Sequence, residues 1–329
     1  MLRRPTFLQI DPPSRDTLAD EADAGLRAPQ AWLSPKLFYD ALGSRLFDAI
    51  TELPEYYPTR TEAALMACHG ADIAAAVRSA LPAAPTLVDL GAGNCTKAAA
   101  LFDLLRPAHY VAVDISADYL RNTLTCLQRE YPELRMSGVG MDFSVRLALP
   151  GEVLAHERTG AAPQSALIFY PGSSIGNFDP PEALRLLREA RALAPGAALL
   201  IGVDLVKPLE VLLPAYDDAL GVTAAFNLNV LRRLNALLGA DFDLADWQHE
   251  ARFNAAASRI EMHLAARTEV TVRWRGGERH FRAAETIHTE NSYKWTVEGF
   301  AALLAEAGFA QRRHWTDERS WFAVFLASG

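Results

Sequence analysis

A glycine turn between an apolar strand and a helix constrains the fold of this chain more than any other feature. Residues 86–90 are an apolar stretch typical of a buried strand, a Gly-Ala-Gly turn follows at 91–93, and a helical pattern begins near Thr96. Such a turn lets the backbone lie close against a ligand. Asp114 ends the next apolar strand, at the spacing that lets a carboxylate accept both hydroxyls of a ribose. The pattern therefore predicts a domain that binds a nucleoside.

Strands and helices alternate along the chain from about Thr61 to residue 205. This alternation predicts a parallel sheet with helices on both faces. A final helix and an antiparallel hairpin would complete a sheet of seven strands. The helices are expected at 61–80, 97–105, 117–129, 181–193 and 296–307. The strands are expected at 86–90, 109–115, a segment ending at Phe143, 165–170, 197–205, 310–315 and 321–327.

Residues 207–293 interrupt the alternation. Apolar residues recur at helical spacing within 207–240, and the period changes to two within 257–284, where two adjacent glycines mark a hairpin turn. Residues 1–60 read as a loop-rich arm with helices near 35–50. We expect an α/β fold of two domains. A Rossmann-like domain would comprise 61–206 and 294–329, and an α+β domain that binds the substrate would comprise 1–60 and 207–293.

Composition excludes several classes of protein. The 329 residues suffice for two domains, and a net charge of −8 without a basic run argues against nucleic acid as a partner. Cys68, Cys95 and Cys126 form no CxxC pair, so they fit a reducing cytoplasm and make no metal site. The longest apolar stretch, 192–203, is far shorter than the roughly 20 residues of a membrane span. We expect a cytoplasmic protein whose partner is a small molecule, and the sequence leaves the oligomeric state open, a monomer included.

The nucleoside is predicted to be S-adenosylmethionine (SAM) rather than NAD. A dinucleotide motif needs a third glycine so that the helix N-terminus approaches a pyrophosphate, and Thr96 occupies that position here. SAM has a ribose and an adenine but no phosphate. It carries a free carboxylate, for which Lys97 and the turn amides are suitable partners. A glycine turn that only connects strand to helix is the alternative.

Two further strand ends carry candidate binding residues. Asp142 and Phe143 follow the third strand, at the sheet edge where open α/β folds bind ligands. There a carboxylate can accept from an adenine amino group, although an aspartate that only caps the next turn is the alternative. The loop 171–177 follows the fourth strand, and its Asn177 offers a donor and an acceptor to a methyl acceptor. Ordinary turn chemistry is the alternative for Asn177.

Two segments outside the alternation add aromatic and polar groups. The run Leu-Pro-Glu-Tyr-Tyr-Pro-Thr-Arg-Thr-Glu at 53–62 offers the hydroxyl of Tyr56 or Tyr57, and a packed aromatic linker is the alternative. Glu290 and Ser292 place a carboxylate and a hydroxyl close together. A buried carboxylate needs a partner, which a basic ring of the substrate would supply. A surface glutamate near a helix start is the alternative.

Five segments together resemble the methyltransferases that trimethylate the α-amino group of histidine in ergothioneine biosynthesis. Such enzymes convert L-histidine to hercynine, its trimethylammonium betaine, with three molecules of SAM. The resemblance spans almost the whole chain, implies the SAM-dependent methyltransferase sheet, and is most specific in the second segment. The matching segments are 38–44, 50–62, 88–93, 169–177 and 289–292.

The resemblance also implies roles for individual residues. Tyr39 and Asn177 would take part in catalysis, Tyr39 by accepting or relaying the proton of the amine. Asn177 and Tyr216 would hold the substrate carboxylate, and Glu290 would read the imidazole. The residues implied to surround SAM are Tyr39, Gly91, Gly93, Lys97, Asp114, Asp142 and Phe143. The residues implied to bind the substrate are Tyr56, Gly172, Asn177, Tyr216, Met262, Glu290 and Ser292.

The implied reaction needs no metal and no covalent enzyme intermediate, because positioning of the two reactants supplies most of the rate. An enzyme of the same fold that methylates tryptophan or tyrosine is the main alternative. Glu290 argues against it, since a carboxylate suits an imidazole N–H better than an apolar ring. A non-catalytic SAM-binding protein is a second alternative. A flavin or NAD oxidoreductase is the weakest, because Thr96 replaces the third glycine.

Overall fold

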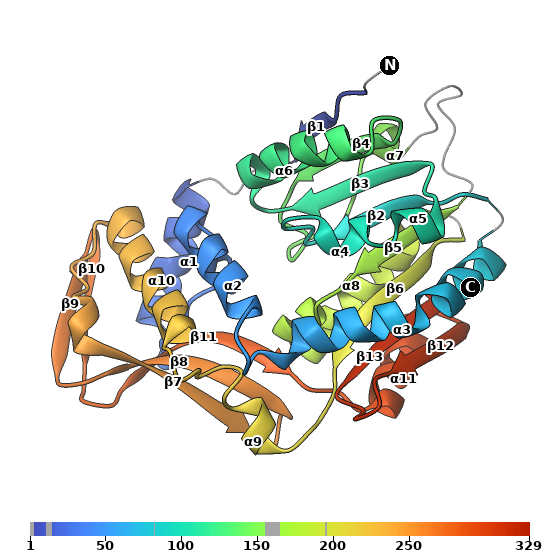
Figure 1. Cartoon of the computed structure of the whole chain (residues 1–329). Coiled ribbons are helices and arrows are strands. Elements are labelled where there is room, and N and C mark those ends of the chain that lie inside the picture. The colour runs from blue at the N-terminus through green and yellow to red at the C-terminus, as the bar shows by residue number, and fades with distance from the viewer. Residues whose placement is uncertain (1–2, 11–14, 82, 155–164, 195) are drawn as a thin grey trace. The chain divides into compact units, whose positions relative to one another are not determined.

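A computed structural model describes residues 3–10, 15–81, 83–154, 165–194 and 196–329 (Figure 1). The chain divides into two compact units. The first unit comprises Met1–Pro12, Arg60–Leu205 and Trp295–Gly329, and the second comprises Pro13–Thr59 and Val206–Lys294. None of the helices in the described part of the chain combines the length and the apolar character that a membrane crossing needs.

An eight-stranded sheet forms the centre of the first unit, in the order β1-β4-β3-β2-β5-β6-β13-β12 (Figure 1). The strands from β1 to β6 run parallel, and β13 pairs antiparallel with β6 and β12. All residues of β2, β5 and β6 are buried, as expected for strands covered on both faces. The strands are β1 (Thr6–Gln9), β2 (Thr86–Leu90), β3 (His109–Asp114), β4 (Arg135–Gly140), β5 (Ala166–Tyr170), β6 (Ala198–Asp204), β12 (Gln311–Thr316) and β13 (Phe322–Ser328).

Local signals in the sequence set the ends of several helices in this unit. Asp179 and Glu182 form a capping box at the start of α8, and the Thr296 hydroxyl accepts from Gly299 N at the start of α11. The helix α6 buries Leu120, Leu124 and Leu127 at helical spacing. The helices are α3 (Tyr57–Ala80), α4 (Thr96–Ala99), α5 (Phe102–Leu105), α6 (Ala117–Glu130), α7 (Gly151–Leu154), α8 (Pro180–Ala192), α11 (Val297–Glu306) and the 3-10 helix η2 (Ser174–Asn177).

The structure differs from the sequence-based expectation at two places in this unit. The strand β1 adds an eighth strand beside β4, so residues 6–9 belong to the sheet of the first unit and not with the rest of 1–60. The helix expected over 97–105 is two short helices, because Leu101 N bonds to Ala98 O three residues back and tightens the chain between them.

The second unit combines helices with a three-stranded sheet of order β11-β8-β7 and a separate hairpin of β9 and β10. The paired glycines predicted a hairpin here, and one is present, with Arg275 and Gly276 in its turn and Gly277 as the first residue of β10, opposite Trp274. The helix α10 packs against α1 and α2 and against β7 and β8 (Figure 1). The elements are α1 (Arg15–Arg27), η1 (Pro35–Phe38), α2 (Ala41–Thr51), α9 (Leu209–Leu212), α10 (Val222–Leu238), η3 (Leu244–Asp246), β7 (Trp247–Asn254), β8 (Arg259–Ala266), β9 (Val270–Trp274), β10 (Gly277–Phe281) and β11 (Thr286–Tyr293).

A β-bulge at Thr289 divides β11 into two parts. His288 lies opposite His263 on β8, and Glu290 lies opposite the adjacent residue, Met262, so Thr289 is the extra residue. The hydroxyl of Thr289 donates to the Met262 carbonyl at 3.0 Å and holds the bulge in place. Because cross-strand neighbours share a face, the bulge turns His288 and Glu290 to opposite faces of the sheet.

Candidate active site

The glycine turn after β2 is tied to the end of β3 through Asp114. Gly91 and Gly93 have φ values of +67° and +51°, which residues with a side chain rarely adopt. Gly91 N donates to Val113 O at 2.9 Å. One Asp114 oxygen accepts from Gly93 N at 2.9 Å, and the other accepts from Ser116 N at 2.8 Å. The structure thus brings together the glycine turn and the carboxylate that the sequence assigned to one nucleoside site.

The Asp114 carboxylate has capacity for further donors. Each oxygen of an ionised carboxylate has two lone pairs, and the two backbone bonds use one on each oxygen. Burial raises the pKa of Asp114, while the N–H groups of Ser116 and Gly93 oppose that rise. Two adjacent hydroxyl donors would stabilise the charged form further. A ribose presents such a pair.

Phe143 and Asp142 lie beyond the end of β4, which stops at Gly140. The Phe143 ring lies over the glycine turn, since a Cβ added at Gly91 would be 3.8 Å from Phe143 Cζ. Asp142 Oδ1 accepts from Ser144 N at 3.0 Å, so it caps the following turn. Asp142 thus caps the next turn, which was the alternative to a role in adenine binding. Its contact with adenine stays a prediction.

Lys97 forms an ion pair that the sequence did not reveal. Its Nζ lies 2.7 Å from a carboxylate oxygen of Glu62 on α3. The Glu62 carboxylate also accepts from Gly172 N at 2.8 Å, and its side chain is 5% exposed. Glu62 thus offsets the charge of Lys97, which was expected to serve the SAM carboxylate alone. The sequence did carry a signal for Glu62, because this residue ends the most specific matching segment, 50–62.

The loop after β5 carries Gly172 and Asn177. Gly172 has a φ of +78°, and a Cβ added there would be 3.0 Å from Lys97 Nζ, so this glycine keeps space beside the lysine. Ser173 holds the loop in place, because its hydroxyl accepts from Asp204 N on β6 at 2.8 Å. Asn177 ends the 3-10 helix η2 and is half-buried at the carboxyl side of the sheet.

Aromatic rings in the second unit form a continuous row. Tyr39 meets Phe47 edge to face with ring centroids 6.0 Å apart, Phe47 meets Tyr56 at 6.2 Å, and Tyr56 meets Tyr216 at 6.4 Å. Phe226 on α10 backs the row against Tyr39 and Phe47. Faces of such rings attract quaternary ammonium groups. Phe47 was not predicted, although it lies on α2 between two matching segments.

A polar cluster of three side chains lies beside this row. The Tyr216 hydroxyl is 2.7 Å from the Ser292 hydroxyl. Lys294 Nζ donates to Tyr216 Oη at 2.7 Å and to Ser292 Oγ at 2.8 Å, and its ammonium lies 4.7 Å from the centre of the Tyr216 ring. Lys294 is only 3% exposed. The sequence reasoning missed it, although it follows Ser292 by two residues at strand spacing.

Glu290 shares a face of β11 with this cluster, because alternate residues of a strand point to one side. Its cross-strand neighbour is Met262. Burial raises the pKa of Glu290 to about 7, and the positive charge of Lys294 acts against that rise. A hydrogen bond from an N–H donor stabilises the ionised form of such a carboxylate. An imidazole has an N–H of this kind.

The predicted residues fall into two sets, one in each unit. Gly91, Gly93, Lys97, Asp114, Asp142 and Phe143 lie in the first unit with Gly172 and Asn177. Tyr39, Tyr56, Tyr216, Met262, Glu290 and Ser292 lie in the second. Tyr39 is thus in a different unit from the other residues assigned to SAM, and Gly172 and Asn177 are in a different unit from the other residues assigned to the substrate. The individual roles stay predictions.

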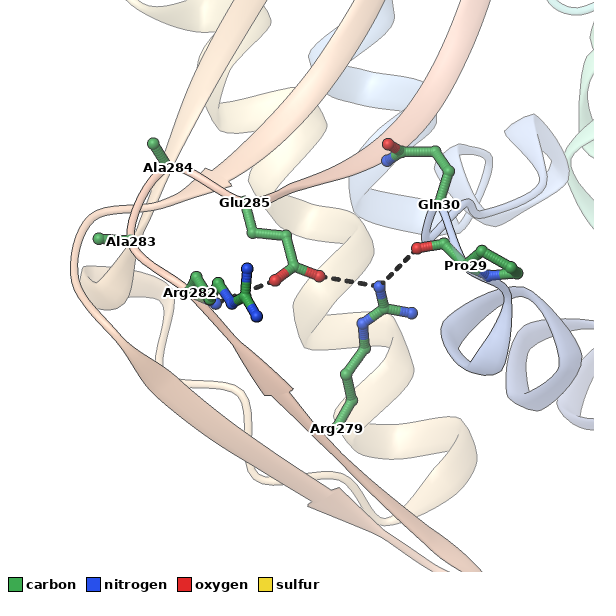
Figure 2. Close-up of a pocket in the computed structure, with 7 residues that line it drawn as sticks. All are labelled: Pro29, Gln30, Arg279, Arg282, Ala283, Ala284 and Glu285. Carbon is green, nitrogen blue, oxygen red and sulfur yellow. Dashed lines mark hydrogen bonds and ion pairs between the residues drawn. The ribbon is translucent and has the colours of Figure 1, made fainter.

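A pocket of about 410 Å³ opens elsewhere on the second unit, and none of the predicted residues lines it. In Figure 2, Glu285 lies between Arg279 and Arg282 and is linked to both. Arg279 donates to Glu285 Oε1 at 2.8 Å and to Pro29 O at 3.1 Å, and Arg282 N donates to Glu285 Oε2 at 3.0 Å. The pocket is lined by Pro29, Gln30, Arg279, Arg282, Ala283, Ala284 and Glu285. Glu285 offsets the charge of one of the two arginines.

Comparison with known proteins places this geometry in context. A profile of the family described as "Histidine-specific methyltransferase, SAM-dependent" matches residues 18–329. The histidine N-alpha-methyltransferase of Mycolicibacterium smegmatis is 43% identical over 321 residues, which are 95% of each chain. The protein of the same name from Mycobacterium tuberculosis is 42% identical over 312 residues, covering 93% of this chain and 92% of the relative.

A longer fungal relative matches as well. Ergothioneine biosynthesis protein 1 of Schizosaccharomyces pombe is 32% identical over 287 residues. The match covers 84% of this chain and 36% of the fungal protein. The similarity therefore corresponds to one part of that larger protein.

Proposed function

The chain belongs to the family of histidine-specific, SAM-dependent methyltransferases, and from this premise we propose that it trimethylates the α-amino group of L-histidine to give hercynine in ergothioneine biosynthesis. The observation that carries the choice of substrate is Glu290. It is a buried carboxylate with a raised pKa, on one strand face with a hydroxyl and a buried lysine. An imidazole N–H can donate a charge-assisted hydrogen bond to this carboxylate.

The residues of the first unit fit SAM. Gly91 and Gly93 leave space above the turn, and the Asp114 oxygens can each accept one ribose hydroxyl in addition to their backbone donors. The Phe143 ring over the turn offers an apolar surface to adenine. When bound, SAM supplies a methyl group on a positively charged sulfur. Gly91, Gly93, Asp114 and Phe143 would hold its nucleoside, and Lys97 with Glu62 would meet its amino-acid end.

The family resemblance assigns several residues to the amino acid. Tyr216 offers its hydroxyl to the substrate carboxylate, and the amide of Asn177 offers a second donor. Glu290 and Ser292 would bind the imidazole, and Tyr56 and Met262 would pack against it. The backbone of Gly172 would lie near the amine. Each contact fixes the amino acid in one orientation, and orientation supplies most of the rate in a two-reactant transfer.

The amine must be uncharged before it accepts a methyl group. Free α-amino groups titrate near pH 8 in peptides, so a partly desolvated site needs only a modest shift to bind the neutral form. Tyr39 carries a hydroxyl next to the aromatic row and is the candidate to accept or relay the proton. The product is permanently cationic. The faces of Tyr39, Phe47 and Tyr56 would stabilise it by cation–π attraction.

Mass spectrometry of reactions with SAM and one amino acid at a time tests the proposal. Histidine should gain the mass of three methylene units and consume three molecules of SAM. Tryptophan and tyrosine should give little product. Product from tryptophan or tyrosine without product from histidine would favour the alternative substrates. Tight SAM binding without any methylated product would favour a non-catalytic protein.

A further inference from the structure

Lys294 is the least exposed charged side chain near the predicted histidine site, at 3% exposure, and it donates to two neutral hydroxyls. Burial of an ammonium group is unfavourable unless acceptors and negative charge replace its water. Tyr216 Oη and Ser292 Oγ act as acceptors at 2.7 and 2.8 Å. The carboxylate whose pKa Lys294 lowers is Glu290. One buried cation therefore touches or influences three residues that the proposed function assigns to the substrate.

The hydrogen bonds of this cluster limit how its two hydroxyl groups can donate and accept. An ammonium can only donate, so both hydroxyl oxygens accept from Lys294. The two hydroxyls also bond to each other at 2.7 Å, and one of them must be the donor. Whichever hydroxyl donates, the other keeps its hydrogen for a bond outside the cluster. Lys294 thus occupies an acceptor position on each hydroxyl oxygen and restricts the directions in which the two hydroxyls can donate.

The charge of Lys294 has a second effect, on Glu290. Beyond the bulge, every second residue of the chain points to the same face, and these residues are Glu290, Ser292 and Lys294. Met262 on β8 is the residue opposite Glu290. The ionisable residues Glu261 and His263 flank Met262 on β8 and belong to the opposite face, where His263 stacks near His288. Tyr216 and Tyr56 are further ionisable groups beside the cluster, and His249 on β7 lies next to it, with Nε2 2.7 Å from the Tyr216 carbonyl oxygen. Lys294 is the cation whose charge acts on the Glu290 carboxyl.

We propose that Lys294 is a positioning residue for histidine, which orients the Tyr216 and Ser292 hydroxyls and provides the counter-charge for Glu290. This inference rests on the proposed function. Lys294 itself does not contact the substrate in this proposal. The hydroxyls of Tyr216 and Ser292 and the carboxylate of Glu290 depend on this one buried cation, which the sequence motifs do not include.

A second buried lysine in the same unit provides a matched control. Lys207 is 8% exposed, donates to Tyr57 Oη at 2.9 Å, and has its ammonium 4.4 Å from the centre of the Tyr57 ring. Lys207 resembles Lys294 in its burial and in donating to a tyrosine, but Tyr57 is not among the residues that the family resemblance assigns to the substrate. A purely structural role for a buried Lys–Tyr pair would apply equally to both lysines.

The experiment compares Lys294→Met, Lys294→Arg and Lys207→Met with wild type. The histidine KM and kcat are measured from about pH 6 to about pH 9 at saturating SAM. Histidine and SAM affinities are measured separately by calorimetry. Lys294→Met should weaken histidine binding about 10- to 100-fold, because the hydroxyls lose their common donor. SAM affinity should stay within about twofold of wild type.

The pH profile separates positioning from general damage. Without the lysine charge, the acid limb of kcat/KM for histidine should move to higher pH by about one unit. Lys294→Arg should keep that limb in place while the histidine KM rises, since charge is retained and the hydrogen-bond geometry is not. Titration of free histidine is the same for all variants and cancels in the comparison. Lys207→Met should leave both the histidine affinity and the acid limb unchanged.

Two results would overturn the inference. One is a Lys294→Met protein with wild-type histidine affinity and an unmoved acid limb. The other is an equal loss in Lys207→Met, which would show that any buried lysine of this unit has the same effect. If Lys294→Met does not fold, Lys294→Gln and Lys294→Arg are judged by the same two readouts. A wild-type enzyme that does not methylate histidine would instead reject the proposed function, independently of every Lys294 variant.

Discussion

Nζ of Lys97 lies 2.7 Å from a carboxylate oxygen of Glu62, which precedes it by 35 residues. The same carboxylate accepts from Gly172 N, 110 residues further along the chain. Glu62 thus links α3 to the helix after the glycine turn and to the loop after β5. Those segments carry Lys97, which the sequence assigned to SAM, and Gly172, which it assigned to the substrate, so we expect Glu62 to act on the site through both.

Removal of the Glu62 carboxylate should weaken both the fold and SAM binding. Glu62→Ala leaves Gly172 N–H and the Lys97 ammonium without their acceptor, at a cost of about 1–3 kcal/mol in unfolding free energy. Glu62→Gln retains an acceptor for Gly172 and should cost less. Urea unfolding and SAM calorimetry measure the two effects. The exposed Glu52 provides the control, since Glu52→Gln should change stability by no more than about 0.5 kcal/mol. Equal behaviour of the Glu62 and Glu52 variants would contradict the prediction.

Asp114→Ala should reduce SAM affinity several-fold or more. The variant loses the proposed acceptors for the ribose and also frees Gly93 N from the bond that ties the turn to β3. Asp114→Asn separates these effects, because an amide oxygen can still accept from one backbone N–H. Calorimetric titration with SAM measures the loss. Asp118→Ala, at an exposed site four residues later, should bind SAM as wild type does. Unchanged affinity in Asp114→Ala would remove the ribose assignment.

Glu290→Ala should lose at least tenfold in kcat/KM for histidine. A charge-assisted bond to an imidazole N–H contributes roughly 1.5–3 kcal/mol, which corresponds to roughly 10- to 150-fold. Activity on tryptophan should rise relative to histidine, because no buried carboxylate then opposes an apolar ring. Both amino acids are assayed at fixed SAM, with Glu278→Ala on the exposed end of β10 as the control. An unaltered histidine-to-tryptophan ratio would mean that another residue selects the substrate.

Glu290→Gln should stabilise the ligand-free protein at high pH and not at low pH. The folded-state pKa of Glu290 is about 7, above its ordinary value of 4.5, so folding favours the protonated form. The cost of the buried charge is absent below pH 4.5, grows as the pH rises through 7, and is constant above that. Its full size is about 3 kcal/mol. Urea unfolding of both proteins at about pH 5 and about pH 8 tests the sign. A stability difference that does not grow with pH would contradict the raised pKa.

The sequence predicts the parallel sheet well because its strands are local features. The strands expected at 86–90 and 165–170 are short, mainly apolar segments followed by glycine turns, and β2 and β5 occupy those positions. The strand β1 carries no such signal, since it has four residues and none of them is fully buried. Its place beside β4 follows from pairing with a distant partner. Short edge strands of this kind are determined by tertiary contacts and not by local pattern.

The candidate site was predictable where chemistry follows a strand end or a matching segment. Asp114 and Gly93 are such positions, and the structure joins them by a hydrogen bond. Lys294 was not predictable in this way, because its importance comes from Tyr216, which is 78 residues away in sequence. Glu62 is similar. Its partners are a backbone N–H and an ammonium that only the folded chain brings to it.

The bulge at Thr289 determines where β11 can lose a residue while its other side chains keep their faces. One extra residue is already accommodated there, so the pairing of His288 with His263 and of Glu290 with Met262 is continuous on either side of it. Loss of Thr289 would leave both sets of side chains on their present faces. Loss of Asn291 would instead turn Glu290 away from Ser292, because a shift of one residue reverses the side to which a strand residue points. The strand β11 should therefore keep its two faces when residue 289 is deleted and lose them when residue 291 is deleted.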